Sequence, residues 1–218
     1  MTTLITGASR GIGAALLARA RASGEDALGT ARRPAQGSDL LPLDVTDPAS
    51  VADLARRLDG RPLARLVCNA GVYLDKGESL DTGYPAEMWA ESFAVNVTGV
   101  FLTIQALLPN LRAHGAGAAI AVIASQMGSQ ARAPGGSYIY RASKAAAINL
   151  ARNLAADLAP GGIAVAAYHP GWVRTDMGGD AADLAPDEAA RGLWSEIAAL
   201  DMARSGAFRT WDGRDHPL

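Results

Sequence analysis

Short apolar segments alternate with longer amphipathic segments along almost the whole chain. The apolar segments have the length and composition of buried strands, and they fall at residues 3–5, 27–30, 40–43, 65–68, 118–124 and 163–168. Helical periodicity marks residues 14–23, 48–58 and 86–111, and an Ala-rich run that begins near residue 140 and stops at residues 159–162. Strands that alternate with helices form a parallel sheet covered on both faces. The pattern therefore predicts an α/β fold with one doubly wound sheet.

Size and composition fit a single domain. The chain of 218 residues is 49% hydrophobic and 19% charged, which is enough apolar material for one compact core over residues 1–218. No internal repeat or linker interrupts the alternation. The formal net charge is −2 and no basic block stands out. We therefore expect neither nucleic acid nor an anionic membrane surface as a partner.

Cysteine and histidine usage bears on compartment and chemistry. The single cysteine, Cys68, cannot form an internal disulfide, and the first residues lack the basic and apolar regions of a signal peptide. The longest apolar run, residues 116–124, is far shorter than the ~20 residues of a membrane helix. We therefore expect a cytoplasmic protein. No catalytic metal is expected, because the three histidines have no ligand-type neighbours at metal-binding spacing; they are His114, His169 and His216.

The first strand leads into a glycine-rich turn and then a helix. Glycine lets the backbone turn tightly and approach a ligand closely, and the free N–H groups at a helix start attract a pyrophosphate. Gly24 ends this helix ahead of the next strand, which completes the βαβ unit of a Rossmann fold. We expect the turn to bind a dinucleotide, the alternative being an ordinary strand-to-helix turn. Its candidate residues are Gly7, Ser9, Arg10, Gly11, Ile12 and Gly13.

The end of the second strand indicates which dinucleotide binds. An acidic residue here would bind the adenosine ribose, whereas an arginine accommodates a 2′-phosphate. This strand is followed by Arg32 and Arg33, with no carboxylate. Arg32 and Arg10 could together clamp a phosphate through charge-assisted hydrogen bonds. The sequence therefore predicts NADP(H) rather than NAD(H), the alternative being that these arginines are solvated surface charges.

The third and fourth strands end in further candidates for cofactor binding. Asp44 and Val45 end the third strand, where Asp44 would either face an adenine edge or cap the turn. The fourth strand breaks at Asn69, Ala70 and Gly71. There the amide can fix the neighbouring backbone and the glycine can let a ribose pass.

Two polar residues stand out in apolar surroundings. Asn96 lies inside an otherwise apolar helical segment, where it serves either a function or the helix structure alone. Ser125 stands at the carboxyl end of the fifth strand, the edge at which open parallel sheets bind ligands. A loop rich in glycine, alanine and proline, residues 126–136, can bring its hydroxyl close to Tyr140.

Tyr140 and Lys144 lie four residues apart at the start of the Ala-rich helix and therefore share a face. A cation about 4 Å from a phenol contributes roughly 4 kcal/mol in a partly screened site, enough to lower its pKa by up to about three units. Such a tyrosine can exchange protons near neutral pH. The alternative is a solvated helix face, but Lys144 is one of only two lysines against eighteen arginines, which favours a special role.

The motifs together resemble the short-chain dehydrogenase/reductase family over nearly the whole chain. Within that family, residues 169–177 and the tail from Ser205 to Gly213 are similar to the C-factor and sniffer-type carbonyl reductases. Two features depart from the family pattern. Cys68 stands where a second asparagine is common, and the spacing from Ser125 to Tyr140 is slightly long, which leaves Ser129 and Ser137 as alternatives for the hydroxyl role.

The resemblance implies a mechanism with four catalytic residues: Asn96, Ser125, Tyr140 and Lys144. NADPH would deliver hydride to a carbonyl carbon while Tyr140 donates a proton to the oxygen, or the reverse in oxidation. Ser125 would bind the carbonyl oxygen, Lys144 would also bind the nicotinamide ribose, and Asn96 would hold a water in a proton relay. The nicotinamide side of the site would be formed by Pro170, Gly171, Val173 and Thr175.

The substrate and the assembly are less defined by sequence. The small residues after Met177 suggest a short flap over an open pocket. Candidate lining residues, for which ordinary core packing is the alternative, are Met127, Tyr138, Trp172 and Met177. We expect a small carbonyl or alcohol substrate and a homodimer or homotetramer, with Trp89 at the subunit contact. A second hypothesis is a C-factor-like signalling or regulatory protein that binds a nucleotide and has secondary reductase activity.

Overall fold

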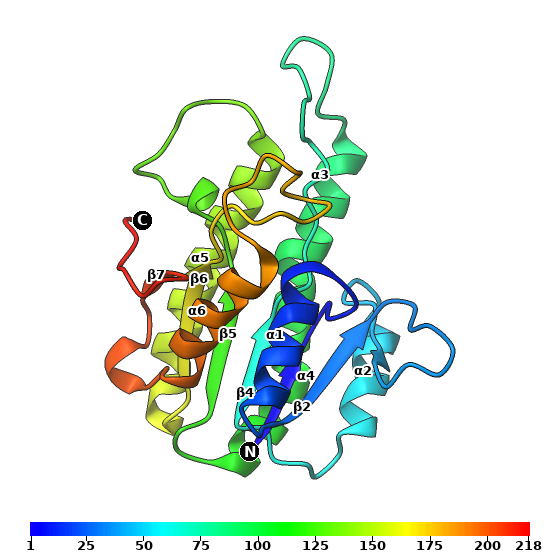
Figure 1. Ribbon diagram of the computed structural model, residues 1–218, viewed down its shortest axis with the longest axis vertical. Helices are drawn as coiled ribbons and strands as arrows, with labels where there is room; N and C mark the ends of the chain where they lie inside the picture. The colour runs from blue at the N-terminus through cyan, green and yellow to red at the C-terminus, as the bar shows by residue number, and fades with distance from the viewer.

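The computed structural model describes residues 1–218 and contains one seven-stranded parallel sheet (Figure 1). Its strand order is β3-β2-β1-β4-β5-β6-β7. The predicted doubly wound sheet is confirmed, and the strand order reverses between β1 and β4, the kind of position where open sheets bind ligands. The strands are β1 (Thr2–Ile5), β2 (Asp26–Ala31), β3 (Leu41–Pro42), β4 (Arg65–Cys68), β5 (Ala119–Ile123), β6 (Ala164–His169) and β7 (Phe208–Thr210).

Helices cover both faces of the sheet. Side chains alternate between the faces of each strand, so Leu4 and Ile120 pack on one face while Ile5 and Ala121 pack on the other. The central strands are buried on both faces and are therefore almost wholly apolar, which made them recognisable in the sequence. One face carries α1 (Gly11–Ala22) and α6 (Pro186–Ala198); the other carries α2 (Pro48–Arg57), α4 (Gly99–His114) and α5 (Tyr138–Leu158) (Figure 1).

The helix predicted over residues 86–111 is divided by a π-helical turn. It consists of α3 (Ala86–Phe93), the π turn Ala94–Thr98, and α4. The whole run is long and apolar enough to cross a membrane by length and composition alone. Ile104, Leu107 and Leu111 nevertheless belong to the core, as expected of a helix that packs on a sheet.

The sequence reasoning missed the last helix and the last strand. β7 has only three residues, and it is defined by its pairing with β6, in which Phe208 lies opposite Ala167. α6 packs against α1 through Leu193, Trp194 and Ile197. Both elements depend on contacts with distant parts of the chain, whereas the other predicted boundaries differ from the observed ones by only a few residues.

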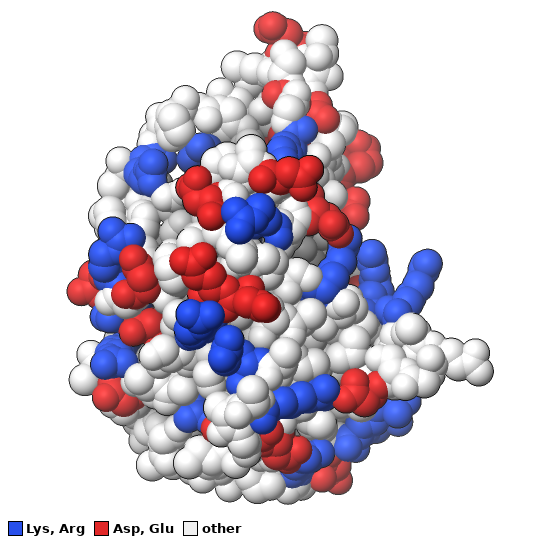
Figure 2. All heavy atoms as spheres, in the orientation of Figure 1, with Lys and Arg blue, Asp and Glu red and all other residues white.

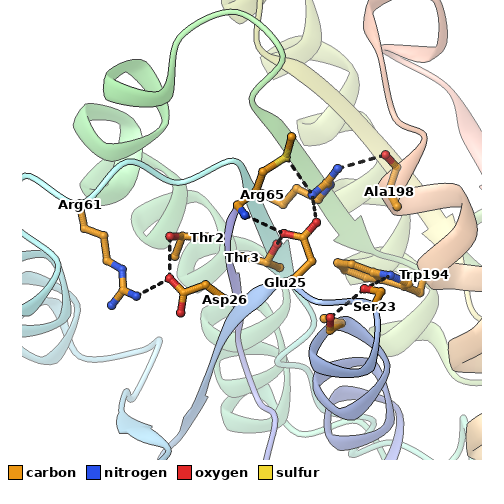
Figure 3. Close-up of polar contacts among 11 residues, drawn as sticks. Thr2, Thr3, Ser23, Glu25, Asp26, Arg61, Arg65, Trp194 and Ala198 are labelled. Atoms are coloured by element: carbon orange, nitrogen blue, oxygen red, sulfur yellow. Dashed lines mark hydrogen bonds and ion pairs between the residues drawn. The ribbon is translucent and has the colours of Figure 1, made fainter.

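Polar contacts gather at the amino ends of the strands, opposite the predicted site (Figure 3). Arg65 on β4 forms an ion pair with Glu25 at 2.9 Å and donates a hydrogen bond to the carbonyl of Ala198 at 3.2 Å. The indole of Trp194 donates to the Ser23 hydroxyl at 3.0 Å. These contacts join α6 to the sheet and to α1, which assigns this edge a structural role.

Candidate active site

The glycine turn between β1 and α1 leaves the start of the helix open. Gly7 and Gly11 have φ angles of +66° and +56°, a region that side chains other than glycine rarely adopt. Arg10 occupies the N-cap position, and no side chain caps the helix. The first N–H groups of α1 are therefore available to an anionic ligand.

The turn is held against the end of β4 by Asn69. Its amide nitrogen donates to the carbonyl oxygens of Thr6 at 3.0 Å and Gly7 at 3.1 Å. A Cβ on Gly13 would overlap both the Gly7 carbonyl oxygen and the Asn69 amide, and a Cβ on Gly7 would lie 2.9 Å from the Cα of Ala70. The structure thus brings together the predicted residues of the turn and those after β4.

The end of β2 presents Arg32 on the surface without an ion-pair partner, and no carboxylate occupies that strand end. The Asp44 carboxylate instead accepts hydrogen bonds from the Thr46 hydroxyl at 2.7 Å and its N–H at 2.9 Å. These bonds, with smaller contributions from Arg32 and Arg33, hold the pKa of Asp44 below its usual value. Asp44 therefore caps its turn through Oδ1, while a contact of Asp44 with an adenine edge stays a prediction. Val45 packs against Gly99.

Charged side chains of both signs are interspersed over the face shown in Figure 2, and basic side chains project near the carboxyl end of β2, which Arg32 and Arg33 follow. This local excess of positive charge lies beside the glycine turn (Figure 1). It is suited to a phosphate, whereas the mixed surface elsewhere on this face offers no extended basic region.

The segment after β6 folds down onto the glycine turn. The Thr175 methyl group would lie 3.3 Å from a Cβ placed on Gly11, and Asp176 forms an exposed ion pair with Arg10. The Thr175 hydroxyl accepts from the N–H of Gly178 at 3.1 Å, so it is engaged within its own loop. The segment is positioned to cover a ligand bound at the turn.

Ser125 and Tyr140 line one cavity of about 350 Å³ at the carboxyl ends of β5 and β6. Ser125 precedes a 3₁₀ turn, where its hydroxyl accepts from the Met127 N–H at 3.1 Å. Gly128 follows and packs against the backbone of α5 at Lys144, which brings the two segments together. A larger hollow of about 630 Å³ on the outer side of α5 holds none of the predicted site residues.

The net lowering of the Tyr140 pKa that the spacing to Lys144 predicts is not found, because burial shifts this pKa upward. Burial raises the pKa of Tyr140 to about 12, although a hydrogen bond to Ser125 acts in the opposite direction. Burial also lowers the pKa of Lys144 to about 8. Removal from water penalises both the phenolate of Tyr140 and the ammonium of Lys144. This cost exceeds the attraction between the two charges that their helical spacing predicts. The phenol therefore keeps its proton at neutral pH.

Lys144 and Asn96 converge on Gly71. The Lys144 ammonium donates to the carbonyl of Ile123 at 2.9 Å, and a Cβ on Gly71 would lie 3.4 Å from that nitrogen and 3.2 Å from the Asn96 side-chain oxygen. The Asn96 amide accepts from the Val72 N–H at 2.8 Å and donates to its carbonyl at 2.9 Å. Asn96, in the π turn, thus holds the backbone that follows β4, while its part in a water relay stays a prediction.

Three of the four predicted substrate residues line the cavity: Met127, Trp172 and Met177. The assignment of Tyr138 is wrong. Tyr138 lies two residues before Tyr140 on the same helix, so the two side chains point in different directions. The Tyr138 side chain is exposed, and its ring packs edge-on against the Tyr84 ring with centroids 5.2 Å apart. Of the alternative hydroxyls, Ser137 pairs with the Tyr73 hydroxyl at 2.6 Å. Ser129 is buried outside the cavity lining.

The sequence reasoning missed two residues of the loop 73–85. The Tyr73 ring stacks on the ring of Tyr140 with centroids 4.2 Å apart. Asp75 is fully buried, and its carboxylate accepts from the N–H of Ile139 at 2.8 Å and of Tyr140 at 3.2 Å. Asp75 therefore caps α5 from a distant loop. No signal in the sequence indicates this cap, because Ser137 directly before the helix is itself a preferred N-cap residue. Only the structure shows that the Ser137 side chain makes no cap hydrogen bond.

Replacing Asp75 with alanine is expected to destabilise the protein by about 1–3 kcal/mol and to lower turnover. The substitution leaves two buried N–H groups at the start of α5 without acceptors, and these groups fix the backbone of Tyr140. Chemical denaturation measures the first effect and steady-state kinetics the second. The exposed Asp81 in the same loop is the matched control, and equal stability of the two alanine variants would contradict the capping role.

His169 begins the segment 169–177, and the sequence assigns its side chain no role. It ends β6, is 8% exposed and lines the cavity, and its Nδ1 atom has no hydrogen-bond partner. Burial lowers its pKa to about 4, with nearby His216 and Arg132 acting in the same direction. It is therefore a neutral polar group in the cavity wall.

Comparison with known proteins places this arrangement in a family. Residues 1–184 match the short chain dehydrogenase family, and the chain belongs to it. The predicted resemblance is confirmed, and the chain is accordingly an oxidoreductase of this class.

Particular relatives support the narrower resemblance to carbonyl reductases and the C-factor. The chain is 40% identical over 157 residues to the C-signal of Myxococcus xanthus, covering 72% of this chain and 93% of the relative. NADPH-bound carbonyl reductase from chicken fatty liver superposes with a TM-score of 0.89, at 32% identity, covering 100% of this chain and 98% of that one. Carbonyl reductase Sniffer of D. melanogaster superposes with a TM-score of 0.92 at 26% identity, covering 100% of this chain and 99% of that one.

Proposed function

We propose that this protein is an NADP(H)-dependent oxidoreductase that interconverts a carbonyl and an alcohol, with Tyr140 as its acid and base. The observation that carries the proposal is one cavity into which the hydroxyls of Ser125 and Tyr140 both open, beside the segment that folds over the glycine turn. Two hydroxyls beside a dinucleotide site can bind and protonate a carbonyl oxygen.

The residues present fit a dinucleotide. The open start of α1 suits the pyrophosphate, the tight packing at Gly13 keeps the turn close to the ligand, and Arg32 is free for a 2′-phosphate. The resemblance to NADPH-bound carbonyl reductase from chicken favours the same choice. Pro170, Gly171 and Val173 line the cavity and would hold the nicotinamide end. When bound, NADPH supplies the hydride.

The polar side chains divide the remaining work. Ser125 donates a hydrogen bond to the carbonyl oxygen and orients it toward Tyr140. Tyr140, whose pKa of about 12 keeps it protonated, donates the proton as negative charge develops on that oxygen. Lys144, largely protonated at neutral pH with a pKa of about 8, favours the phenolate that remains. The phenolate of Tyr140 is then reprotonated through Lys144 and Asn96, the polar groups around Gly71.

Consumption of NADPH with a panel of aldehydes and ketones tests the proposed function. We expect turnover of at least one carbonyl class together with appearance of the corresponding alcohol. Tight NADPH binding without reduction of any carbonyl would overturn it.

Replacing Arg32 with alanine is expected to raise the KM for NADPH by about 10- to 100-fold while the KM for NADH changes little. A charge-assisted hydrogen bond to a phosphate contributes about 1.5–3 kcal/mol, and only NADPH has the 2′-phosphate. Steady-state kinetics with both cofactors measures the difference. Arg57→Ala, an exposed arginine on α2, is the control. Equal effects of Arg32→Ala on the two cofactors would show that Arg32 does not contact the phosphate.

A signalling or regulatory role is the second candidate, and it is favoured by the similarity to C-signal. The presence of all four predicted catalytic residues supports the enzyme as the primary function. If the protein binds NADPH without turning over a substrate, Tyr140→Phe and the wild type should behave alike in every NADPH-dependent measurement.

A further inference from the structure

The cavity beside Tyr140 has one charged residue in its wall. Among the residues that line it, only Lys76 carries a formal charge, and the lining contains no aspartate or glutamate. The chain has only two lysines, and the other, Lys144, belongs to the same site. A cavity with a single cation and no anion favours an anionic ligand group.

Lys76 has no carboxylate partner in the protein. No ion pair in the structure includes it, although four acids stand near it along the chain or in the segment around Met177: Asp75, Glu78, Asp176 and Asp180. Asp75 uses both carboxylate oxygens to cap α5, and Asp176 pairs with Arg10. The Lys76 side chain is therefore exposed at the cavity without an ion-pair partner in the protein, and its ammonium is available to an anionic ligand group.

The backbone on which Lys76 stands is held in place. Three residues before it, Tyr73 stacks on Tyr140, and the Tyr73 hydroxyl pairs with Ser137. Directly before it, Asp75 is fixed to α5. The Lys76 nitrogen would lie 3.6 Å from a Cβ placed on Gly179, so the side chain reaches across to the segment after Met177. Lys76 thus stands between the two segments that border the cavity.

The remaining wall is mostly apolar and neutral. Met127, Trp172 and Met177 contribute apolar surface, Tyr73 and Tyr140 contribute aromatic rings, and a cavity of about 350 Å³ accommodates a small substrate. Ser125 and Tyr140 would bind the carbonyl, and the Lys76 ammonium is a second polar group in the same wall. The lining therefore offers two polar anchors joined by an apolar surface.

We propose that Lys76 binds an anionic group of the substrate, so that the substrate class is carbonyl compounds that carry a carboxylate on an apolar body. The inference rests on the proposed function, because it assumes that the reacting carbonyl lies at Tyr140. It assigns Lys76 to substrate specificity and leaves the proton transfer to Tyr140. Removing the charge should therefore affect charged substrates selectively.

Matched substrates test the proposal. Meta- and para-carboxybenzaldehyde, which place the carboxylate at two distances from the carbonyl, are compared with the corresponding neutral formylbenzamides. In the wild type, kcat/KM is expected to be about tenfold or more higher for at least one acid than for its amide. Lys76→Met should bring that ratio close to one by lowering kcat/KM for the acid alone, and Lys76→Glu should invert it. Arg57→Met, a charge removed from exposed α2, should leave the ratio unchanged.

A binding measurement separates this inference from the proposed function. Calorimetry on the NADP⁺-saturated protein compares the hydroxymethylbenzoates with their amides and needs no turnover. A preference for the acid that Lys76→Met removes supports the inference even if no aldehyde is reduced, in which case only the proposed function fails. Equal turnover and equal binding of acids and amides, or a preference that persists in Lys76→Met, overturns the inference while the proposed function stands.

Discussion

Replacing Tyr140 with phenylalanine is expected to lower kcat for carbonyl reduction by about a hundredfold to ten-thousandfold, the usual contribution of a positioned proton donor. The change removes one oxygen and leaves the ring, which stacks on Tyr73 at 4.2 Å and is held by the Asp75 cap. The Ser125 hydroxyl remains as a hydrogen-bond donor to the carbonyl oxygen. Steady-state kinetics with the best carbonyl of the panel measures the loss.

The loss should be in chemistry rather than in folding or cofactor binding. NADPH affinity, followed by the fluorescence of the bound cofactor, should change little, and the free energy of unfolding should not fall. Tyr168→Phe is the matched control, since this tyrosine is buried on β6 and makes only a 3.4 Å hydrogen bond to Glu196. A Tyr140→Phe variant that retains most of its turnover would assign the proton transfer to another group.

Replacing Gly13 with alanine is expected to abolish measurable dinucleotide binding and to destabilise the fold by about 1–3 kcal/mol, as overpacking does. The added methyl group would overlap the Gly7 carbonyl and the Asn69 amide. Both neighbours are held by hydrogen bonds between the turn and the end of β4, so neither can move without breaking them. The turn that we propose as the pyrophosphate site would then shift away from the start of α1.

Calorimetric titration with NADP⁺ and chemical denaturation measure the two effects of Gly13→Ala. Gly161→Ala is the control, because a Cβ at that position meets nothing within 4 Å and its φ is not positive. Normal NADP⁺ affinity in Gly13→Ala would mean that the turn tolerates the displacement, and the proposed pyrophosphate site would have to be placed elsewhere.

The parts of the site that lie close together in sequence were the predictable ones. The glycine turn is a local strand-to-helix connection, and the positions of Tyr140 and Lys144 follow from helical spacing. Ser125 follows because a residue at the carboxyl end of a parallel strand lies at the ligand-binding edge of the sheet. For these residues the local backbone largely determines where the side chain goes.

Burial and loop contacts could not be predicted in the same way. Tyr138 is an aromatic candidate for the cavity lining in the sequence, but the turn of α5 directs it to the surface. The opposite pKa shifts of Tyr140 and Lys144 arise because both groups are removed from water by segments far away in the sequence. The contribution of Asp75 depends on a loop that reaches α5 from more than sixty residues away.

The sequence by itself determined the order of strands and helices as far as β6, the glycine turn after β1 and the helical face shared by Tyr140 and Lys144, because periodicity and glycine placement act over a few residues. Only the tertiary structure decided which side chains line the cavity, what caps α5 and which charge is left without a partner. Those features depend on desolvation and on contacts between distant loops, and neither is encoded in local spacing.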